Sequence, residues 1–273
     1  MIDDNSKEYV IYQGNKIFVE NDKLCLPCNL KSLNEIEGLQ ELKNLTYLEC
    51  YAYSLKKIEN LDGLINLEYL IINKSDYIEK IENLETLSNL KGLDLSENRI
   101  SKISGLDNLK KLESLRICRN LLTEINGLDE LSNLKELLLR QNEISEIKGL
   151  KNLSNLEVLS LSENRITEIK ELENLTSLRK LNLNENKITE IKGLDNLKKL
   201  NKLHLAANKI SDVKGIEPLK SLERIDLQIN GLDHLQGLET LPNLKTVVLR
   251  ENEVSIESCE ILDILREKGV QII

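Results

Sequence analysis

Apolar and polar residues alternate along this chain with a fixed period of 22 residues. The sequence before each marker asparagine reads L-x-x-L-x-L-x-x-N, with an occasional Ile or Val for Leu, and x-I-x-x-I follows it. The eight marker residues are Asn98, Asn120, Asn142, Asn164, Asn186, Asn208, Asn230 and Asn252. A repeat of this length is typical of a solenoid, in which each copy buries its apolar residues against the next.

Each L-x-L segment predicts a short β-strand. Side chains alternate along a strand, so both Leu residues point to one side and the x residues to the other. Strands stacked in parallel about 4.8 Å apart form one sheet, with Leu buried and the x positions on a solvent-facing concave face. The later Ile and Leu residues, three apart, predict short 3₁₀ turns on the convex side.

Two polar columns complete the repeat. We expect the marker asparagine to bond the backbone of its own turn and of the next repeat, satisfying buried groups. A second column lies between the Ile and the following Leu, and Gly and Asn there predict a left-handed backbone, with Glu171 as the strained exception. Its members are Gly38, Asn60, Asn83, Gly105, Gly127, Gly149, Glu171, Gly193, Gly215 and Gly237.

The two ends of the chain depart from the repeat and predict caps. "YVIYQGNKIFVE" alternates around Gly14-Asn15, which predicts a β-hairpin folded over the first repeat. "SIESCEILDILREKG" predicts a helix that stops at Gly269, followed by a short strand, "VQII". We therefore expect a single domain, 1–273, with the hairpin cap in 1–23, the repeats in 24–252 and the C-terminal cap in 253–273.

This pattern resembles a leucine-rich repeat of the 22-residue class. It is similar to the leucine-rich regulatory subunit of protein phosphatase 1 and to the repeat region of bacterial internalins, over roughly Leu24 to Asn252. The resemblance implies an α/β fold: a right-handed solenoid, curved like a horseshoe, with a parallel sheet on its concave side. The shared residues are structural, so the resemblance is specific for the fold and says little about function.

Composition limits the partners. The net charge is −9, which argues against nucleic acid or an anionic membrane as the main partner. The start, "MIDDNSKEYV", lacks the charge pattern of a signal peptide, and no apolar run reaches the length of a membrane span. We therefore expect a cytoplasmic, monomeric protein.

Five cysteines raise the question of metal or redox chemistry. "CLPC", Cys25 to Cys28, has the spacing of a zinc or redox site, but four-ligand zinc needs two more ligands and both histidines lie many repeats away. Cys28 and Cys50 are 22 residues apart, so we expect both to be buried in the inward column. Cys25 is expected in the cap and Cys118 on the concave face. We predict neither a metal site nor a cofactor.

Catalytic motifs are missing from the sequence. It contains no phosphate-binding loop, nucleophile elbow or metal-binding His pair, so we predict that the chain is not an enzyme. His204 faces the concave surface with Lys180, Lys202 and Arg224 nearby, and we interpret it as a contact residue rather than a general base.

Candidate binding residues come from the variable x positions. Tyr47, Tyr51, Tyr69 and Ile71, with Glu49 between them, place an aromatic cluster on neighbouring strands of a chain that is only 3% aromatic. A second set is the basic row Lys180, Lys202 and Arg224 with His204. Two plainer interpretations remain open: the tyrosines pack under the hairpin cap, and the basic residues serve solubility.

These observations predict a non-catalytic scaffold that binds another protein on its concave face. Two alternatives remain. One is a regulatory subunit of an enzyme such as a phosphatase, which the resemblance implies. The other is a fragment of an internalin-like surface adhesin, although the sequence shows no signal peptide, anchoring segment or immunoglobulin-like tail.

Overall fold

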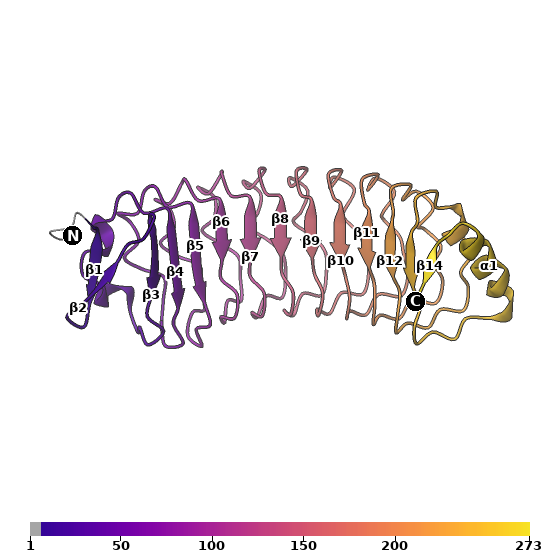
Figure 1. Ribbon diagram of the computed structural model, residues 1–273, viewed down its shortest axis with the longest axis horizontal. Coiled ribbons are helices and arrows are strands. Elements are labelled where there is room, and N and C mark those ends of the chain that lie inside the picture. Colours follow the sequence, from indigo (N-terminus) through magenta and orange to yellow (C-terminus); the bar gives the residue numbers. More distant parts are fainter. Residues whose placement is uncertain (1–6) are drawn as a thin grey trace. The chain divides into compact units, whose positions relative to one another are not determined.

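The computed structural model describes residues 7–273, and the chain forms two compact units, Met1–Leu134 and Lys135–Ile273. Each unit is a stack of short parallel strands joined by loops that run back behind the sheet (Figure 1). The parallel solenoid predicted from the 22-residue period is therefore confirmed. The expectation that the chain is a single domain stays a prediction.

The first unit begins with a hairpin and continues as a parallel sheet. The hairpin pairs β1 (Tyr9–Tyr12) with β2 (Asn15–Phe18), and the sheet strands follow in chain order. They are β3 (Lys23–Leu26), β4 (Tyr47–Tyr51), β5 (Tyr69–Asn73), β6 (Gly92–Asp94) and β7 (Ser114–Arg116), with 3₁₀ helices η1 (Leu33–Glu35) and η2 (Leu39–Glu41).

The second unit continues with the same strand order and ends in a helix. Its last strand, β14, pairs in parallel with β13. Its elements are β8 (Glu136–Leu138), β9 (Val158–Ser160), β10 (Lys180–Asn182), β11 (Lys202–His204), β12 (Arg224–Asp226), η3 (Leu238–Thr240), β13 (Thr246–Val248), η4 (Ile256–Ser258), α1 (Cys259–Glu267) and β14 (Gln271–Ile272).

The core consists of the Leu and Ile columns. Leu159 and Leu161 of one repeat are fully buried, as are their counterparts in the neighbouring repeats. Burying each such side chain contributes about 1.5–3 kcal/mol relative to leaving it exposed. Behind the sheet, the amide of Leu175 donates to the carbonyl of Leu172 over 3.0 Å, and Leu178 repeats this bond with Leu175. These bonds between residues three apart confirm the predicted 3₁₀-type turns.

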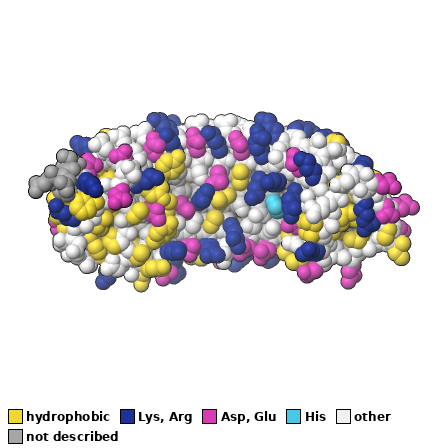
Figure 2. Space-filling model, viewed as in Figure 1, with side chains coloured by type: hydrophobic (Ala, Val, Ile, Leu, Met, Phe, Trp, Pro, Cys, Tyr) yellow, Lys and Arg dark blue, Asp and Glu magenta, His cyan; other side chains and the backbone are white. Residues whose placement is uncertain are grey.

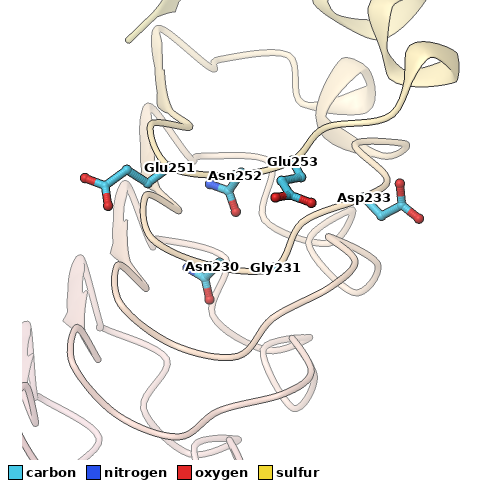
Figure 3. Close-up of a pocket in the computed structure, with 6 residues that line it drawn as sticks. All are labelled: Asn230, Gly231, Asp233, Glu251, Asn252 and Glu253. Carbon is cyan, nitrogen blue, oxygen red and sulfur yellow. The ribbon is translucent and has the colours of Figure 1, made fainter.

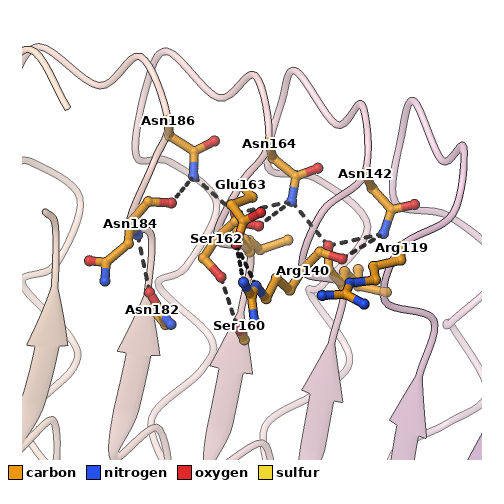
Figure 4. A network of polar contacts seen from close by, with 12 residues as sticks. Arg119, Arg140, Asn142, Ser160, Ser162, Glu163, Asn164, Asn182, Asn184 and Asn186 are labelled. Carbon is orange, nitrogen blue, oxygen red and sulfur yellow. Dashed lines mark hydrogen bonds and ion pairs between the residues drawn. The ribbon is translucent and has the colours of Figure 1, made fainter. Parts of the chain in front are cut away.

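The marker asparagines form a ladder of buried hydrogen bonds (Figure 4). Asn164 donates from Nδ2 to the carbonyl of Leu161 in its own turn, over 3.1 Å, and to the carbonyl of Leu139 over 3.0 Å. Its Oδ1 accepts the amide of Ile144 over 3.0 Å. The expected role is confirmed, with one correction: the bonded neighbour is the preceding repeat, not the next one, because the side chain lies over the turn it has just left.

Left-handed backbone occurs in the column where Gly and Asn predicted it. Gly127 has φ 64° and even Glu171 has φ 55°, so the exceptional residue follows its neighbours. A second left-handed column, directly before the ladder asparagines, was not predicted because no Gly marks it. It comprises Lys74, Glu97, Arg119, Gln141, Glu163, Glu185, Ala207, Ile229 and Glu251.

The register of the first repeat differs from the prediction. Leu26 of β3, not Cys28, pairs with Cys50, and Leu24 pairs with Leu48. The first turn is therefore 24 residues long rather than 22, and Cys28 lies beyond the strand and is exposed. The prediction that Cys28 is buried was wrong, because a count of 22 from Cys50 assumed a regular first repeat.

Both caps are present as predicted. The hairpin turns at Gln13 and Gly14, one residue before the predicted centre, with φ 51° and 78°. Its strand β1 bonds to Glu37 in the first repeat: the amide of Ile11 donates to the Glu37 carbonyl over 3.0 Å. At the other end, Gly269 follows α1 with φ 75° and lets the chain turn into β14.

Candidate functional site

The tyrosine cluster comprises Tyr47, Tyr51, Tyr69 and Ile71, and strands β4 and β5 bring it together. Tyr47 pairs in register with Tyr69, Glu49 with Ile71, and Tyr51 with Asn73. The rings of Tyr47 and Tyr69 lie 6.4 Å apart at 39°. Hydrophobic side chains gather over β3–β5 on the face shown in Figure 2.

Gly92 of the next strand makes room for Tyr69. The two residues pair in register, and a Cβ on Gly92 would lie 2.6 Å from Cδ1 of the Tyr69 ring. The ring therefore lies against the β6 backbone and still keeps 45% of its surface exposed. Sequence reasoning missed this role of Gly92, although its position in the first x column was the available signal.

Glu49 anchors the cluster. The Tyr47 hydroxyl donates to Oε2 of Glu49 over 2.7 Å. Burial, followed by the hydrogen bond to Glu49, raises the pKa of Tyr47 well above its usual range, and the same causes raise the pKa of Tyr51. Both phenols therefore stay protonated at neutral pH and act as hydrogen-bond donors.

Two lysines and an asparagine complete this surface. Lys23 Nζ lies 5.3 Å from the centre of the Tyr47 ring, and Lys74 Nζ lies 5.6 Å from that of Tyr51. Both distances are within the range of cation–π attraction. Asn73 is only 9% exposed, and its buried Oδ1 accepts no hydrogen bond within residues 7–273. Sequence reasoning placed Asn73 in the third x column and gave it no role.

The basic row comprises Lys180, Lys202 and Arg224, and the second unit brings it together. The three residues pair in register on β10, β11 and β12. Both lysines are exposed and Arg224 is half-buried. Lys and Arg side chains gather beside a histidine over this part of the sheet (Figure 2).

His204 has an acidic neighbour as well as the cations predicted from the sequence. Its Nδ1 lies 4.0 Å from Oδ2 of Asp226, which is buried and also accepts the amide of Gln228 over 3.3 Å. Asn182 is half-buried rather than exposed, and its Oδ1 accepts the amide of Asn184 over 3.1 Å. The middle column of the sheet is therefore tied down by local hydrogen bonds.

The cysteines do not converge. Cys50 is buried as predicted, and burial raises the pKa of its thiol to about 12. Cys25 lies on β3, in register with Glu49, and not in the cap; burial and then the charge of Glu49 raise its pKa. Cys118 is half-buried and Cys259 exposed. Across residues 7–273, no group of three His, Cys, Asp or Glu side chains is arranged to hold a metal ion.

A shallow depression near the C-terminal end has no catalytic arrangement. Gly231 lies at its centre, and the side chains of Glu251 and Asp233 point away from one another (Figure 3). The ladder asparagines Asn230 and Asn252 use their amides for backbone bonds there. No helix within the described part of the chain is long and apolar enough to cross a membrane.

Solved structures confirm the fold. Internalin InlF of Listeria monocytogenes is 27% identical with a TM-score of 0.71, and the match covers 95% of this chain and 83% of that one. Internalin C2 of the same organism is 30% identical with a TM-score of 0.62, over 69% and 83%. The ectodomain of the Arabidopsis thaliana receptor kinase GASSHO1/SCHENGEN3 is 26% identical with a TM-score of 0.64, over 85% and 32%.

The parallel solenoid and its side-chain-bearing sheet face define a repeat protein of the interaction-scaffold type. A family model described as leucine-rich repeat matches residues 72–168, and one described as two copies of leucine rich repeats matches residues 176–220. The chain belongs to the leucine-rich-repeat family. Comparison with curated proteins found no match.

Proposed function

We propose that this chain is a non-catalytic scaffold that binds another protein through the tyrosine cluster on β4 and β5. The observation that carries the proposal is the buried, unpartnered Oδ1 of Asn73 beside these tyrosines. A buried acceptor without a partner costs about 1–3 kcal/mol, and a donor from a bound protein would recover this.

The tyrosines suit a binding surface energetically. Their rings are held by the sheet and, for Tyr47, by the bond to Glu49, so little side-chain entropy is lost on binding. Tyrosine is enriched among the residues that dominate interfaces, where truncation costs about 2 kcal/mol or more. The hairpin leaves Tyr69 half exposed, so this ring remains available to a partner.

The comparisons supply a precedent for binding by this fold. The plant receptor kinase ectodomain was solved in complex with CASPARIAN STRIP INTEGRITY FACTOR 2. The internalins among the similar structures favour one more specific candidate, a surface adhesin related to internalin. A regulatory role toward an enzyme such as a phosphatase has no comparable support.

The experiment starts with a pull-down from the native host, followed by mass spectrometry and quantitative binding of the partner. We compare two double variants that each remove two rings: Tyr47→Ala with Tyr69→Ala, and Tyr53→Ala with Tyr77→Ala. Tyr53 and Tyr77 are 57% and 55% exposed in turns outside the strands, which makes them a matched control.

We expect the first double variant to weaken binding by at least about 30-fold, the equivalent of about 2 kcal/mol, and the control to change it less than about threefold. Circular dichroism and urea midpoints establish that both variants are folded. Equal affinity of parent and Tyr47/Tyr69 variant would refute the proposed site.

A further inference from the structure

The basic row of the second unit stands apart from the other cations around it. Many Lys and Arg residues of this unit pair with a carboxylate one repeat away: Arg179 with Glu157 at 3.5 Å, Lys192 with Glu168 at 2.9 Å, and Lys245 with Glu223 at 3.0 Å. In the part of the chain that the structure describes, Lys180, Lys202 and Arg224 have no carboxylate within 4.0 Å. Three adjacent strands therefore present uncompensated positive charge on a protein of net charge −9.

Two amide side chains beside this row are oriented by the backbone. Asn182 accepts the amide of Asn184 at its Oδ1 over 3.1 Å, and Asn184 accepts the amide of Ala206 over 2.8 Å (Figure 4). Both side-chain oxygens are thus occupied, so what each offers a ligand is its NH₂ group. Because the backbone bonds choose the amide orientation, the surface is preorganised to donate hydrogen bonds.

Nearby carboxylates do not neutralise this surface. Asp226 is buried and engaged by Gln228 and His204. Glu157 and Glu223 pair with Arg179 and Lys245, outside the row. The face of β10–β12 therefore offers a set of N–H donors and cations, which is the complement of an oxyanion.

We infer that the face of β10–β12 binds an extended peptide segment that carries aspartate or glutamate side chains. Strands lie about 4.8 Å apart, so Lys180 and Arg224 are separated by about 10 Å, which an extended peptide spans in about three residues. Carboxylates two or three residues apart would meet the basic row, and the amides of Asn182 and Asn184 would donate to carboxylate or peptide oxygens beside it. This surface is separate from the tyrosine cluster and does not depend on it.

A peptide fits this surface better than nucleic acid. All eight aromatic residues of the chain lie at or before Tyr77, so β10–β12 has no ring on which bases would stack. The overall net charge of −9 also repels a long polyanion, whereas a short acidic segment engages only the local donors.

The test uses fluorescence anisotropy with the whole chain and labelled octapeptides. The probe alternates Asp and Ser; the comparison peptides replace Asp by Asn or by phosphoserine, and a labelled oligothymidylate is the nucleic-acid arm. We expect saturable binding of the Asp peptide, weakening with salt, and at least about tenfold weaker binding by the Asn peptide.

Two variants probe the row and the amides. Lys180→Gln, Lys202→Gln and Arg224→Gln together should weaken Asp-peptide binding at least about tenfold. Asn182→Asp keeps the acceptor for Asn184 but replaces the donor by a negative charge, and should weaken binding by a similar factor. The matched control, Lys170→Gln with Lys192→Gln and Lys214→Gln, removes three ion-paired charges and should change binding less than about twofold.

Several outcomes would overturn the inference. One is no Asp-peptide binding up to about 1 mM, a free energy near −4 kcal/mol. Equal weakening by the control triple variant would show an unspecific charge effect. Binding of only the phosphoserine peptide would replace carboxylates by phosphate as the ligand, and tighter binding of oligothymidylate would replace a peptide by nucleic acid. The tyrosine variants leave each of these outcomes unchanged, so the two proposals fail independently.

Discussion

At the residue scale, one asparagine per repeat satisfies backbone groups that the turn leaves unpaired. Asn164 engages the carbonyls of Leu139, Leu161 and Ser162 and the amide of Ile144. Each of these groups lies in the interior, where water is excluded and an unpaired polar group is costly. The ladder is therefore as much a part of the core as the leucines.

We predict that Asn164→Ala lowers the free energy of unfolding by about 1–3 kcal/mol, because it strands buried backbone groups. Asn182→Ala is the control: Asn182 is half-buried and holds one backbone amide, so its loss should cost about 0.5–1.5 kcal/mol. Urea denaturation measures both, and equal midpoint shifts would contradict the ladder's structural role.

Ile229 is a strained residue in the left-handed column before the ladder. It has φ 54° and is 46% exposed. A left-handed backbone is unfavourable for β-branched residues and tolerated by Asn. We predict that Ile229→Asn raises the free energy of unfolding by about 1 kcal/mol. Ile229→Val keeps the branch and should bring no gain; a Val variant as stable as the Asn variant would argue against backbone strain.

At the element scale, the sequence predicted most strands and both caps, because eight ladder asparagines fix the phase of the repeat. It failed where that marker is missing. Ser75 takes the ladder position in a 23-residue repeat, shown by Leu70 pairing with Leu93, and this repeat was counted correctly. The first turn has neither marker, so its 24 residues and the exposure of Cys28 were beyond the pattern.

The candidate site was less predictable than the fold. Alternation places Tyr47, Tyr69 and Glu49 on one face, and this much followed from the sequence. The unpartnered oxygen of Asn73 and the space above Gly92 depend on how side chains settle across strands. A repeat pattern gives the direction of a side chain but not its hydrogen-bond partners.

The strands β3 and β4 set the reactivity of two cysteines. Cys50 points into the core, and burial raises its pKa to about 12, so it should resist a thiol reagent until the protein unfolds. Cys25 should react more slowly than the exposed Cys28, because burial and the charge of Glu49 raise its pKa. We predict that Glu49→Gln speeds labelling of Cys25 at neutral pH. Peptide mapping after timed alkylation measures this, with Cys28 as internal reference; an unchanged rate ratio would separate Cys25 from Glu49.

At the scale of the whole molecule, side-chain chemistry is distributed unevenly along a uniform backbone. Every aromatic residue lies in the first unit, at or before Tyr77, while the basic row lies in the second. The buried columns repeat in both units, so these differences are confined to positions that do not build the fold. Such positions are where a repeat protein acquires binding specificity.

The charged columns behind the ladder link successive repeats and give stability a pH dependence. Hydrogen bonds from Lys170 and Lys192 lower the pKa of Glu146 and of Glu168, respectively. A carboxyl with a lowered pKa in the folded state binds fewer protons than in the unfolded state, whose pKa is about 4.3. The stability from these pairs is therefore present above about pH 4.3 and is lost as the pH falls through the lower folded-state pKa values.

We predict that Lys170→Gln with Lys192→Gln flattens the fall in stability between about pH 5 and pH 3, because the variant has no pairs left to lose. The raised pKa of each lysine acts only in alkaline solution: that stability is complete below about pH 10.4 and lost above it. Urea midpoints at about pH 7, 5, 4 and 3 in low salt measure the effect, since salt screens exposed pairs. Lys180→Gln with Lys202→Gln removes two charges without a partner and should not flatten the curve. If parent and Lys170/Lys192 variant differ by the same amount at every pH, these ion pairs do not link the repeats energetically.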